Sequence, residues 1–232
     1  MTWKWSVYFQ TPDFLERTRL MLIEPEYEPL ICKWCGLADG KRVLDVGCGT
    51  GYFTRLLKRG APGASLTGLD REDLFIERAR REAEQEGLAI DFIEGDGLAL
   101  PFEAGTFDLV VSHTYMSSVP DPVKALSEMK RVLRPGGRIA SVTAMSFMPH
   151  GMSLGQYPEE LAWGKELAKL GNEIWTLCNR LAPLSDYTNR IMLAEMPAFF
   201  ANQGLKHVSA YPIGKLFSLS NAAVPRANKL KW

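Results

Sequence analysis

Short apolar runs alternate with longer amphipathic stretches between residues 41 and 145, and this rhythm predicts alternating strands and helices. Each short run is β-branched or apolar through its centre, as is typical of strands in a parallel sheet that is buried on both faces. Right-handed crossovers between such strands would make the fold a doubly wound α/β sheet. The predicted strands are 42–47, 65–70, 89–96, 107–113 and 138–145. The predicted helical stretches between them are 52–60, 71–87 and 121–137, the last closed by Pro135-Gly136-Gly137.

Two further segments lie outside this rhythm, and they suggest caps around the sheet. A helix is expected near residues 12–24, and helical patterns recur at 158–171 and 188–204. Near the end of the chain, HVSAYPI (207–213) and KLFSLS (215–220) could supply one or two strands, although no clear final strand follows. The predicted parts are an N-terminal helical cap (1–40), an α/β core (41–145), a helical insertion (146–203) and C-terminal strands that complete the sheet (204–232).

The run VLDVGCGTGYF joins the first predicted strand to a helix through Gly47, Gly49 and Gly51. Glycine lacks the Cβ atom that would keep a ligand away from the backbone, and the following helix N-terminus offers free N–H groups. A dinucleotide fingerprint would need its third glycine at position 52, which holds a tyrosine, and Asp45 would repel a pyrophosphate. These departures favour a cationic nucleoside without phosphate over NAD. S-adenosylmethionine, with its ammonium and sulfonium groups, meets that description.

Polar residues also end the next three predicted strands. Asp70 lies about 20 residues beyond the glycine loop, where a carboxylate can accept hydrogen bonds from two ribose hydroxyls. Asp96 ends the third strand and is followed by Gly97, while Ser112 and His113 end the fourth. Because open α/β sheets bind ligands at the carboxyl ends of their strands, we expect these residues to meet at one site.

The motifs VLDVGCGTG, GLD, EGDGLALPF, FDLVVSHTYMSSVPDP and LRPGGRI resemble, in order, the successive motifs of class I methyltransferases. The resemblance covers roughly residues 40–145 and is nearest to the small-molecule branch that resembles ubiquinone and menaquinone methyltransferases (methyltransferase type 11-like). It implies a Rossmann-like fold with a mostly parallel, seven-stranded-type sheet, S-adenosylmethionine as cofactor and S-adenosylhomocysteine as product. In the family, the carboxylate at the position of Asp96 lies against the adenine amino group. The predicted cofactor-binding residues are Asp45, Gly47, Cys48, Gly49, Gly51, Asp70, Arg71, Asp96, Gly97, Ser112 and His113.

Methyl transfer from a sulfonium is an in-line displacement in which the protein chiefly positions the reactants. A general base is needed only if the acceptor carries a proton, and His113 is then the candidate catalytic residue, with a role in the pocket wall as the alternative. The predicted substrate residues are Tyr8, Tyr115, His150 and Trp163. Aromatic residues such as Tyr8 and Trp163 either form a lid over a largely apolar acceptor or belong to the core. The run Leu100-Pro101-Phe102 either lines the adenine pocket or turns the chain.

The amino-acid composition limits the kinds of binding partner that are expected. Lys plus Arg and Asp plus Glu both number 27, so no global positive field attracts nucleic acid, and a small-molecule substrate is expected instead. Cys32 and Cys35 form a lone CxxC pair, while Cys48 and Cys178 lack ligand-like spacing, so we predict reduced thiols and no metal. No segment approaches the roughly 18 apolar residues of a membrane span, and a cytoplasmic location is expected.

Other interpretations of the same pattern remain. A related enzyme could move another group, such as aminopropyl, from a relative of S-adenosylmethionine. The chain could also be a catalytically silent S-adenosylmethionine-binding module, or an NAD-dependent oxidoreductase, which the tyrosine at position 52 and Asp45 argue against. The sequence leaves open the methyl acceptor, its reacting O, N or C atom and the oligomeric state.

Overall fold

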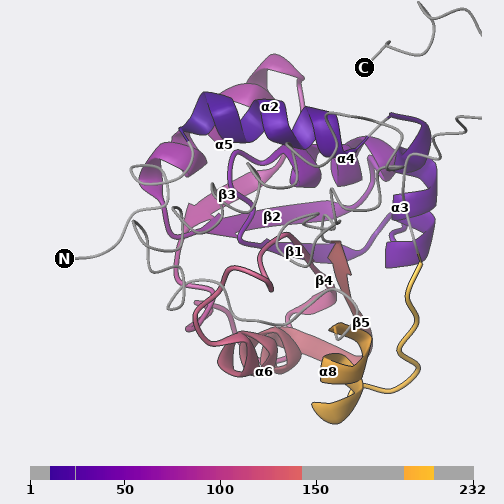
Figure 1. Ribbon diagram of the computed structural model, residues 1–232. Coiled ribbons are helices and arrows are strands. Elements are labelled where there is room, and N and C mark those ends of the chain that lie inside the picture. Colours follow the sequence, from indigo (N-terminus) through magenta and orange to yellow (C-terminus); the bar gives the residue numbers. More distant parts are fainter. Residues whose placement is uncertain (1–10, 24, 143–195, 212–232) are drawn as a thin grey trace, which may run out of the picture.

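The computed structural model describes residues 11–23, 25–142 and 196–211 of the chain, and within them a parallel sheet lies between two layers of helices (Figure 1). Five strands of the described part of the chain pair in the order β3-β2-β1-β4-β5, and each of these pairs is parallel. The strands are β1 (Arg42–Val46), β2 (Ser65–Asp70), β3 (Asp91–Glu94), β4 (Phe107–His113) and β5 (Leu133–Val142). The structure thus confirms the doubly wound α/β fold that the alternating pattern predicts.

Helices cover both faces of this sheet (Figure 1). One face carries α4 (Tyr52–Gly60) and α5 (Asp73–Gln85), and the other carries α6 (Pro122–Val132) and α8 (Met196–Asn202) (Figure 1). The chain leaves β1 toward β2 on one side and returns to β4 on the other, so the strand order reverses between β1 and β4. At such a switch point the flanking connections diverge and leave a crevice at the carboxyl ends of the strands.

The central strands alternate their apolar side chains between the two helix layers. All seven residues of β4 are buried. Val43 and Leu109 pack with the α3 and α4 side chains, whereas Leu44 and Val110 pack with those of α6. Burial on both faces explains why these strands are continuous apolar runs in the sequence.

Among the described residues, two helices precede the sheet: α2 (Pro12–Leu22) and, after the short 3-10 turn η1 (Pro25–Tyr27), α3 (Glu28–Cys35). Thr11 caps α2 by accepting a 3.3 Å hydrogen bond from the Phe14 amide. Helix α2 confirms the helix that was predicted near residues 12–24. Sequence patterning did not predict α3.

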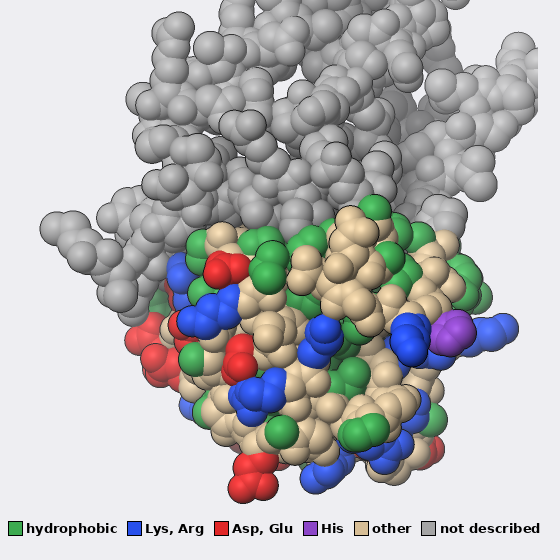
Figure 2. Space-filling view, turned by 90° about the horizontal axis from the view of Figure 1, so that it is seen from below, with side chains coloured by type: hydrophobic (Ala, Val, Ile, Leu, Met, Phe, Trp, Pro, Cys, Tyr) green, Lys and Arg blue, Asp and Glu red, His purple; other side chains and the backbone are tan. Residues whose placement is uncertain are grey.

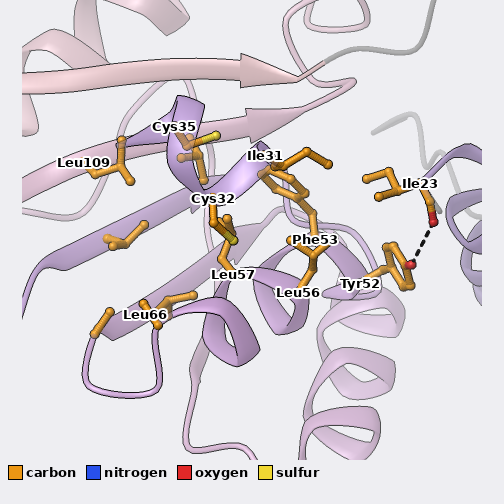
Figure 3. Close-up of a cluster of buried hydrophobic side chains, with 14 residues drawn as sticks. Ile23, Ile31, Cys32, Cys35, Tyr52, Phe53, Leu56, Leu57, Leu66 and Leu109 are labelled. Atoms are coloured by element: carbon orange, nitrogen blue, oxygen red, sulfur yellow. Dashed lines mark hydrogen bonds between the residues drawn. The ribbon is translucent and has the colours of Figure 1, made fainter. Parts of the chain in front are cut away.

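Helix α3 contributes to the core between itself, α4 and the sheet (Figure 3). Cys32 and Cys35 pack there as free thiols beside Phe53 and Leu57 of α4. The Tyr52 hydroxyl at the start of α4 reaches back to the Ile23 carbonyl at 3.4 Å. The CxxC pair therefore belongs to helix packing within the described structure.

The boundaries of two strands differ from the prediction. β3 is shorter than the predicted 89–96, and β5 begins at Leu133, five residues before the predicted 138. Helix α6 ends at Val132, so Pro135-Gly136-Gly137 does not close a helix but forms an excursion within β5, where the register passes from Phe107↔Leu133 to Leu109↔Arg138.

An aspartate holds this irregular start of β5 in place. Asp108 forms an ion pair with Arg134 and accepts a 2.7 Å hydrogen bond from the Arg42 amide. It thus links the starts of β1, β4 and β5 at the edge of the sheet opposite the crevice. The ion pair with Arg134 was not predictable from the sequence, because Arg134 lies next to a Pro-Gly-Gly turn that normally marks a boundary.

The later segments are described only in part. Met196 of α8 is buried against the α6 side of the sheet, and Tyr211 stacks on Trp34 with ring centroids 4.9 Å apart. Residues 207–211 of HVSAYPI are described and form no strand. The insertion between 143 and 195 and the segment 212–232, with the remaining strand predictions, lie outside the described residues. Of the described helices, none has the length and apolar character needed to cross a membrane.

Candidate functional site

A cavity opens at the carboxyl ends of the strands, at the β1/β4 switch point, and its wall comes from several separate parts of the chain. The glycine loop after β1, the ends of β2, β3 and β4, and helix α2 all contribute to it. The lining residues are Leu15, Arg19, Gly47, Gly49, Leu69, Asp70, Arg71, Glu72, Phe75, Gly95, Asp96, Gly97, Leu98, His113, Thr114, Tyr115, Ser118, Val119 and Pro120.

Asp70 is fixed in this wall by backbone donors. Its Oδ2 atom accepts a 2.9 Å hydrogen bond from the Gly49 amide, and its Oδ1 atom accepts one of 3.1 Å from the Glu72 amide. Burial raises the pKa of Asp70 to about 6, although both backbone N–H groups oppose that rise. The side chain thus joins the end of β2 to the glycine loop and is ionised for the most part at neutral pH.

Asp45 lies deeper, at the end of β1. Its Oδ2 atom accepts a 2.7 Å hydrogen bond from the Thr54 hydroxyl, whereas its Oδ1 atom is buried with no hydrogen-bond partner among the described residues. Burial raises its pKa to about 7, and the negative charge of Asp70 adds to the rise. A buried carboxylate with an unused oxygen needs a donor or a cation, so this site fits a positively charged ligand better than a phosphate.

The site glycines leave room for neighbouring side chains. A Cβ atom added to Gly47 would lie 2.5 Å from the Tyr115 ring, and one added to Gly97 would lie 2.3 Å from the Tyr115 hydroxyl. Gly47 also has a φ of 72°, which other residues rarely adopt. The prediction that these glycines admit a ligand is therefore incomplete, because both also accommodate the ring of Tyr115.

His113 and Ser112, the last two residues of β4, lie in different environments. His113 lines the cavity and packs against the Phe53 ring, with centroids 5.3 Å apart. Burial lowers the pKa of His113 to about 3, and the positive charge of Arg19 adds to the effect. Ser112 is fully buried, with its hydroxyl 3.3 Å from that of Ser141 on β5, and it does not line the cavity.

The structure brings most of the predicted site residues together. Those in the cavity wall are Gly47, Gly49, Asp70, Arg71, Asp96, Gly97, His113 and Tyr115. Asp45, Cys48, Gly51 and Ser112 lie behind it and support the loop or strand ends. Tyr8, His150 and Trp163 lie outside the described residues.

Helix α2 contributes residues to the cavity wall that were not predicted from the sequence. Leu15 packs on the glycine loop, where a Cβ atom on Gly49 would lie 3.0 Å from its side chain. Arg19, one turn further along, lines the cavity and donates a 2.8 Å hydrogen bond to the Thr114 hydroxyl. The four-residue spacing of Leu15 and Arg19 predicts a shared helix face, but no sequence signal shows what that face touches.

The alternative roles of the 100–102 run are now distinguishable. Leu100 is buried in the core, and its amide donates a 2.8 Å hydrogen bond to Glu128 of α6. Arg131 of α6 donates to the carbonyls of Leu100 and Phe102, at 2.8 and 2.7 Å. Leu98 lines the cavity instead, so residues 100–102 turn the chain in this structure. Within the described residues there is no group of His, Cys, Asp and Glu side chains that could hold a metal.

Most of the cavity wall, including its acidic strand ends, lies in a segment of the chain that matches a known protein family. Residues 44–141 match the family described as a methyltransferase domain. This part of the chain is similar to a methyltransferase domain. Helix α2, with Leu15 and Arg19, precedes the matched residues of the domain.

Curated proteins that are similar to this part of the chain include enzymes named as methyltransferases. A demethylmenaquinone methyltransferase of Thermus thermophilus is 46% identical over 99 residues, which are 43% of this chain and 45% of the relative. A ubiquinone/menaquinone biosynthesis C-methyltransferase of Ruegeria is 42% identical over 109 residues (46% and 43%). A sterol 24-C-methyltransferase of Pneumocystis carinii is 34% identical over 146 residues (59% and 37%). The chain spans less than half the length of these three relatives.

Solved structures show the same fold. The YcgJ protein of Bacillus subtilis aligns with a TM-score of 0.56 and 23% identity, covering 78% of this chain and 68% of that protein. A protein of Methanococcus maripaludis aligns with a TM-score of 0.56 and 22% identity, covering 83% and 80%. At these identities the comparison supports the Rossmann-like methyltransferase fold.

Proposed function

We propose that this protein binds S-adenosylmethionine in the cavity at the β1/β4 switch point and transfers its methyl group to a small-molecule acceptor. The observation that carries the proposal is the Asp70 carboxylate, held at the cavity by the Gly49 and Glu72 amides within a methyltransferase domain. The bound cofactor would supply a methyl group that its sulfonium charge already activates. The protein would then act mainly by binding and positioning.

Each acidic strand end has a distinct proposed role. Asp70 would accept hydrogen bonds from the ribose hydroxyls, and Asp96, which also lines the cavity, would bind the adenine amino group. Asp45 would face the positive charge of the cofactor from beneath the glycine loop, where its Oδ1 atom has no partner among the described residues. Arg71, Gly47 and the other predicted wall residues would complete the cofactor side of the cavity.

His113 lies in the wall as a neutral imidazole. With its pKa lowered to about 3 by burial, it would hold an abstracted proton poorly at neutral pH. We therefore propose that His113 contacts the reactants, and that as a base it would serve only an acceptor whose proton is itself acidic. Tyr115 lines the cavity beside it and is the described member of the proposed acceptor site, which also includes Tyr8, His150 and Trp163.

The proposed acceptor is a largely apolar or aromatic small molecule. The names of the quinone and sterol relatives support this class. Nucleic acid is not proposed as a partner, since the chain carries balanced charge and Figure 2 shows basic, acidic and hydrophobic side chains interspersed on one face. A cytoplasmic location is proposed with it, and the three free cysteines of the described residues are consistent with that.

Calorimetric titration tests the cofactor directly. The purified protein is titrated with S-adenosylmethionine, S-adenosylhomocysteine and NAD, beside an Asp70→Ala variant. Asp91→Ala is the matched control, because Asp91 is an exposed aspartate at the start of β3, on the opposite edge of the sheet. Thermal unfolding of each variant shows that it is folded before it is titrated.

We expect binding of the two adenosyl ligands to weaken at least about tenfold in Asp70→Ala, because two charge-assisted hydrogen bonds are lost, and to be unchanged in Asp91→Ala. Mass spectrometry of candidate acceptors then identifies a gain of one methyl group. Preference for NAD, or binding that Asp70→Ala leaves intact, would contradict the proposed function.

A further inference from the structure

Helix α2 brings a positive charge to the cavity. Arg19 lines the wall between the glycine loop and the end of β4, and one of its N–H groups donates to the Thr114 hydroxyl at 2.8 Å. A guanidinium has five N–H donors, and this is the one hydrogen bond that Arg19 makes to the described residues. No carboxylate among those residues lies within ion-pair distance of it.

Glu16, the acidic residue whose charge acts on Arg19, already has other partners. Glu16, one turn earlier in the same helix, forms a buried ion pair with Arg55 of α4 and accepts a 2.6 Å hydrogen bond from the Thr50 hydroxyl in the glycine loop. Arg55 also donates a 2.8 Å hydrogen bond to the Thr50 carbonyl. We call these three residues the α2 latch, since they join α2 to the loop at the start of α4.

The α2 latch fixes the position of helix α2, and with it the position of Arg19. Leu15 packs on Gly49 while Glu16 is bound to Arg55, so α2 has a defined position over the glycine loop. Arg19 is held at the cavity by the same helix. Burial lowers the pKa of Arg19 to about 10, which leaves the group charged at neutral pH. Arg19 is a cation withdrawn from bulk water, and its remaining donors bond to none of the described residues. Such a group at a cavity is suited to a carboxylate ligand.

We propose that Arg19 binds the carboxylate of the amino-acid part of the methyl donor, so that α2 completes the cofactor site. This inference rests on the proposed function, because it takes S-adenosylmethionine as the ligand of the cavity. It divides recognition between two parts of the chain. The matched domain would bind the nucleoside through Asp70 and Asp96, and the preceding helix would bind the amino-acid carboxylate.

Two ligands that differ only in the amino-acid part test this assignment. S-adenosylhomocysteine carries the carboxylate, and 5′-methylthioadenosine has the same nucleoside and thioether without it. Both are titrated by calorimetry into the full-length wild-type protein and into Arg19→Met, which keeps the length of the side chain and removes the charge. Arg17→Met is the matched control, because Arg17 is an exposed residue of the same helix.

In Arg19→Met we expect affinity for S-adenosylhomocysteine to fall roughly 10- to 100-fold, with affinity for 5′-methylthioadenosine little changed. Arg17→Met should bind both ligands as the wild type does, and Arg19→Lys should recover part of the lost affinity. An equal loss for both ligands, or no loss for either, would overturn the assignment of Arg19. Failure of the wild type itself to bind S-adenosylhomocysteine would instead overturn the proposed function, and the inference with it.

Discussion

At the scale of single residues, burial around the cavity favours the neutral form of each titratable group: it raises the pKa of the aspartates and lowers the pKa of the histidine. Desolvation raises the pKa of Asp45 to about 7 and that of Asp70 to about 6, and it lowers the pKa of His113 to about 3. The two aspartates contribute stability that is lost as pH rises through their folded pKa values. His113 has the opposite dependence, because its unfolded form binds the proton more tightly.

His113 therefore predicts a measurable change of stability with pH. Between an unfolded pKa of about 6.5 and the folded value of about 3, the unfolded chain binds the additional proton, so stability falls as pH decreases through this window. The contribution lost between pH 7 and pH 5 is on the order of 2 kcal/mol. Urea unfolding of the wild type and of His113→Gln at both pH values measures it. Equal losses in the two proteins would contradict the lowered pKa.

The sequence predicted the site residues that follow from strand periodicity and missed those that follow from packing. Asp70, Asp96 and His113 could be placed because parallel strands end at a common edge. Arg19 could not, because its contact with Thr114 joins positions 95 residues apart, and no periodicity relates them. Patterning also assigned Ser112 to the site, since it identifies the end of a strand more easily than the direction in which the last side chains point.

At the scale of elements, the α2 latch is the interaction that holds a helix from outside the matched domain on the glycine loop. Arg55 is 2% exposed and also forms an ion pair with Glu86, which follows α5, so one side chain links α2, α4 and the end of α5. A buried ion pair is costly to break on one side, because the remaining charge stays buried without its partner.

We therefore predict that Arg55→Met is more damaging than removal of both latch charges. Loss of Arg55 alone should destabilise the protein by about 3–5 kcal/mol, since Glu16 is left buried and unpaired by it. The double variant Arg55→Met/Glu16→Met should be more stable than Arg55→Met. Urea unfolding of the single and double variants gives the coupling energy. Additive effects of the two substitutions would show that the pair is not coupled.

The boundaries of helices and strands were predictable only where residues close in sequence determine them. The starts of α2 and α6 were predictable, because Thr11 and Asp121 cap helices that have proline in the first turn. The start of β5 was not, because Pro135 and two glycines read locally as a turn while Leu133 already pairs with Phe107. Helix α3 spans eight residues, too few for a clear amphipathic repeat, and it follows a proline-containing turn.

At the scale of the whole molecule, the cavity depends on segments that only the complete fold brings together. Its wall takes residues from α2, from the glycine loop and from the ends of three strands. A ligand that binds only this assembled wall stabilises the native state as a whole, by an amount set by its concentration relative to its dissociation constant.

Binding of the cofactor product should therefore raise the melting temperature of the whole protein. At about 100 times its dissociation constant, S-adenosylhomocysteine should add about 2.7 kcal/mol to the stability and raise the melting temperature by roughly 5–10 °C. NAD at the same concentration should leave the melting temperature unchanged. Scanning calorimetry or dye-based melting measures both. A shift with NAD alone would contradict the identification of the ligand.

The fold of the described core was predictable as a whole because the alternation of strands and helices and the right-handed crossover rule leave few arrangements. The five-strand order β3-β2-β1-β4-β5 places the predicted glycine loop and acidic strand ends at one edge. The place of residues 146–203 in the fold was less predictable, since helical periodicity indicates helices without indicating the surface that they contact.

The ring of Tyr115, which lies against both Gly47 and Gly97, also limits how this site can change over evolutionary time. A methyl group at position 97 would lie 2.3 Å from the tyrosine hydroxyl and 2.9 Å from Val46, so a smaller residue at 115 would remove the more severe of the two clashes. The effect of a substitution at either position thus depends on the residue at the other. Among homologues, positions 97 and 115 should therefore vary as a pair, and an acceptor preference that depends on the size of residue 115 would be inherited together with the glycine.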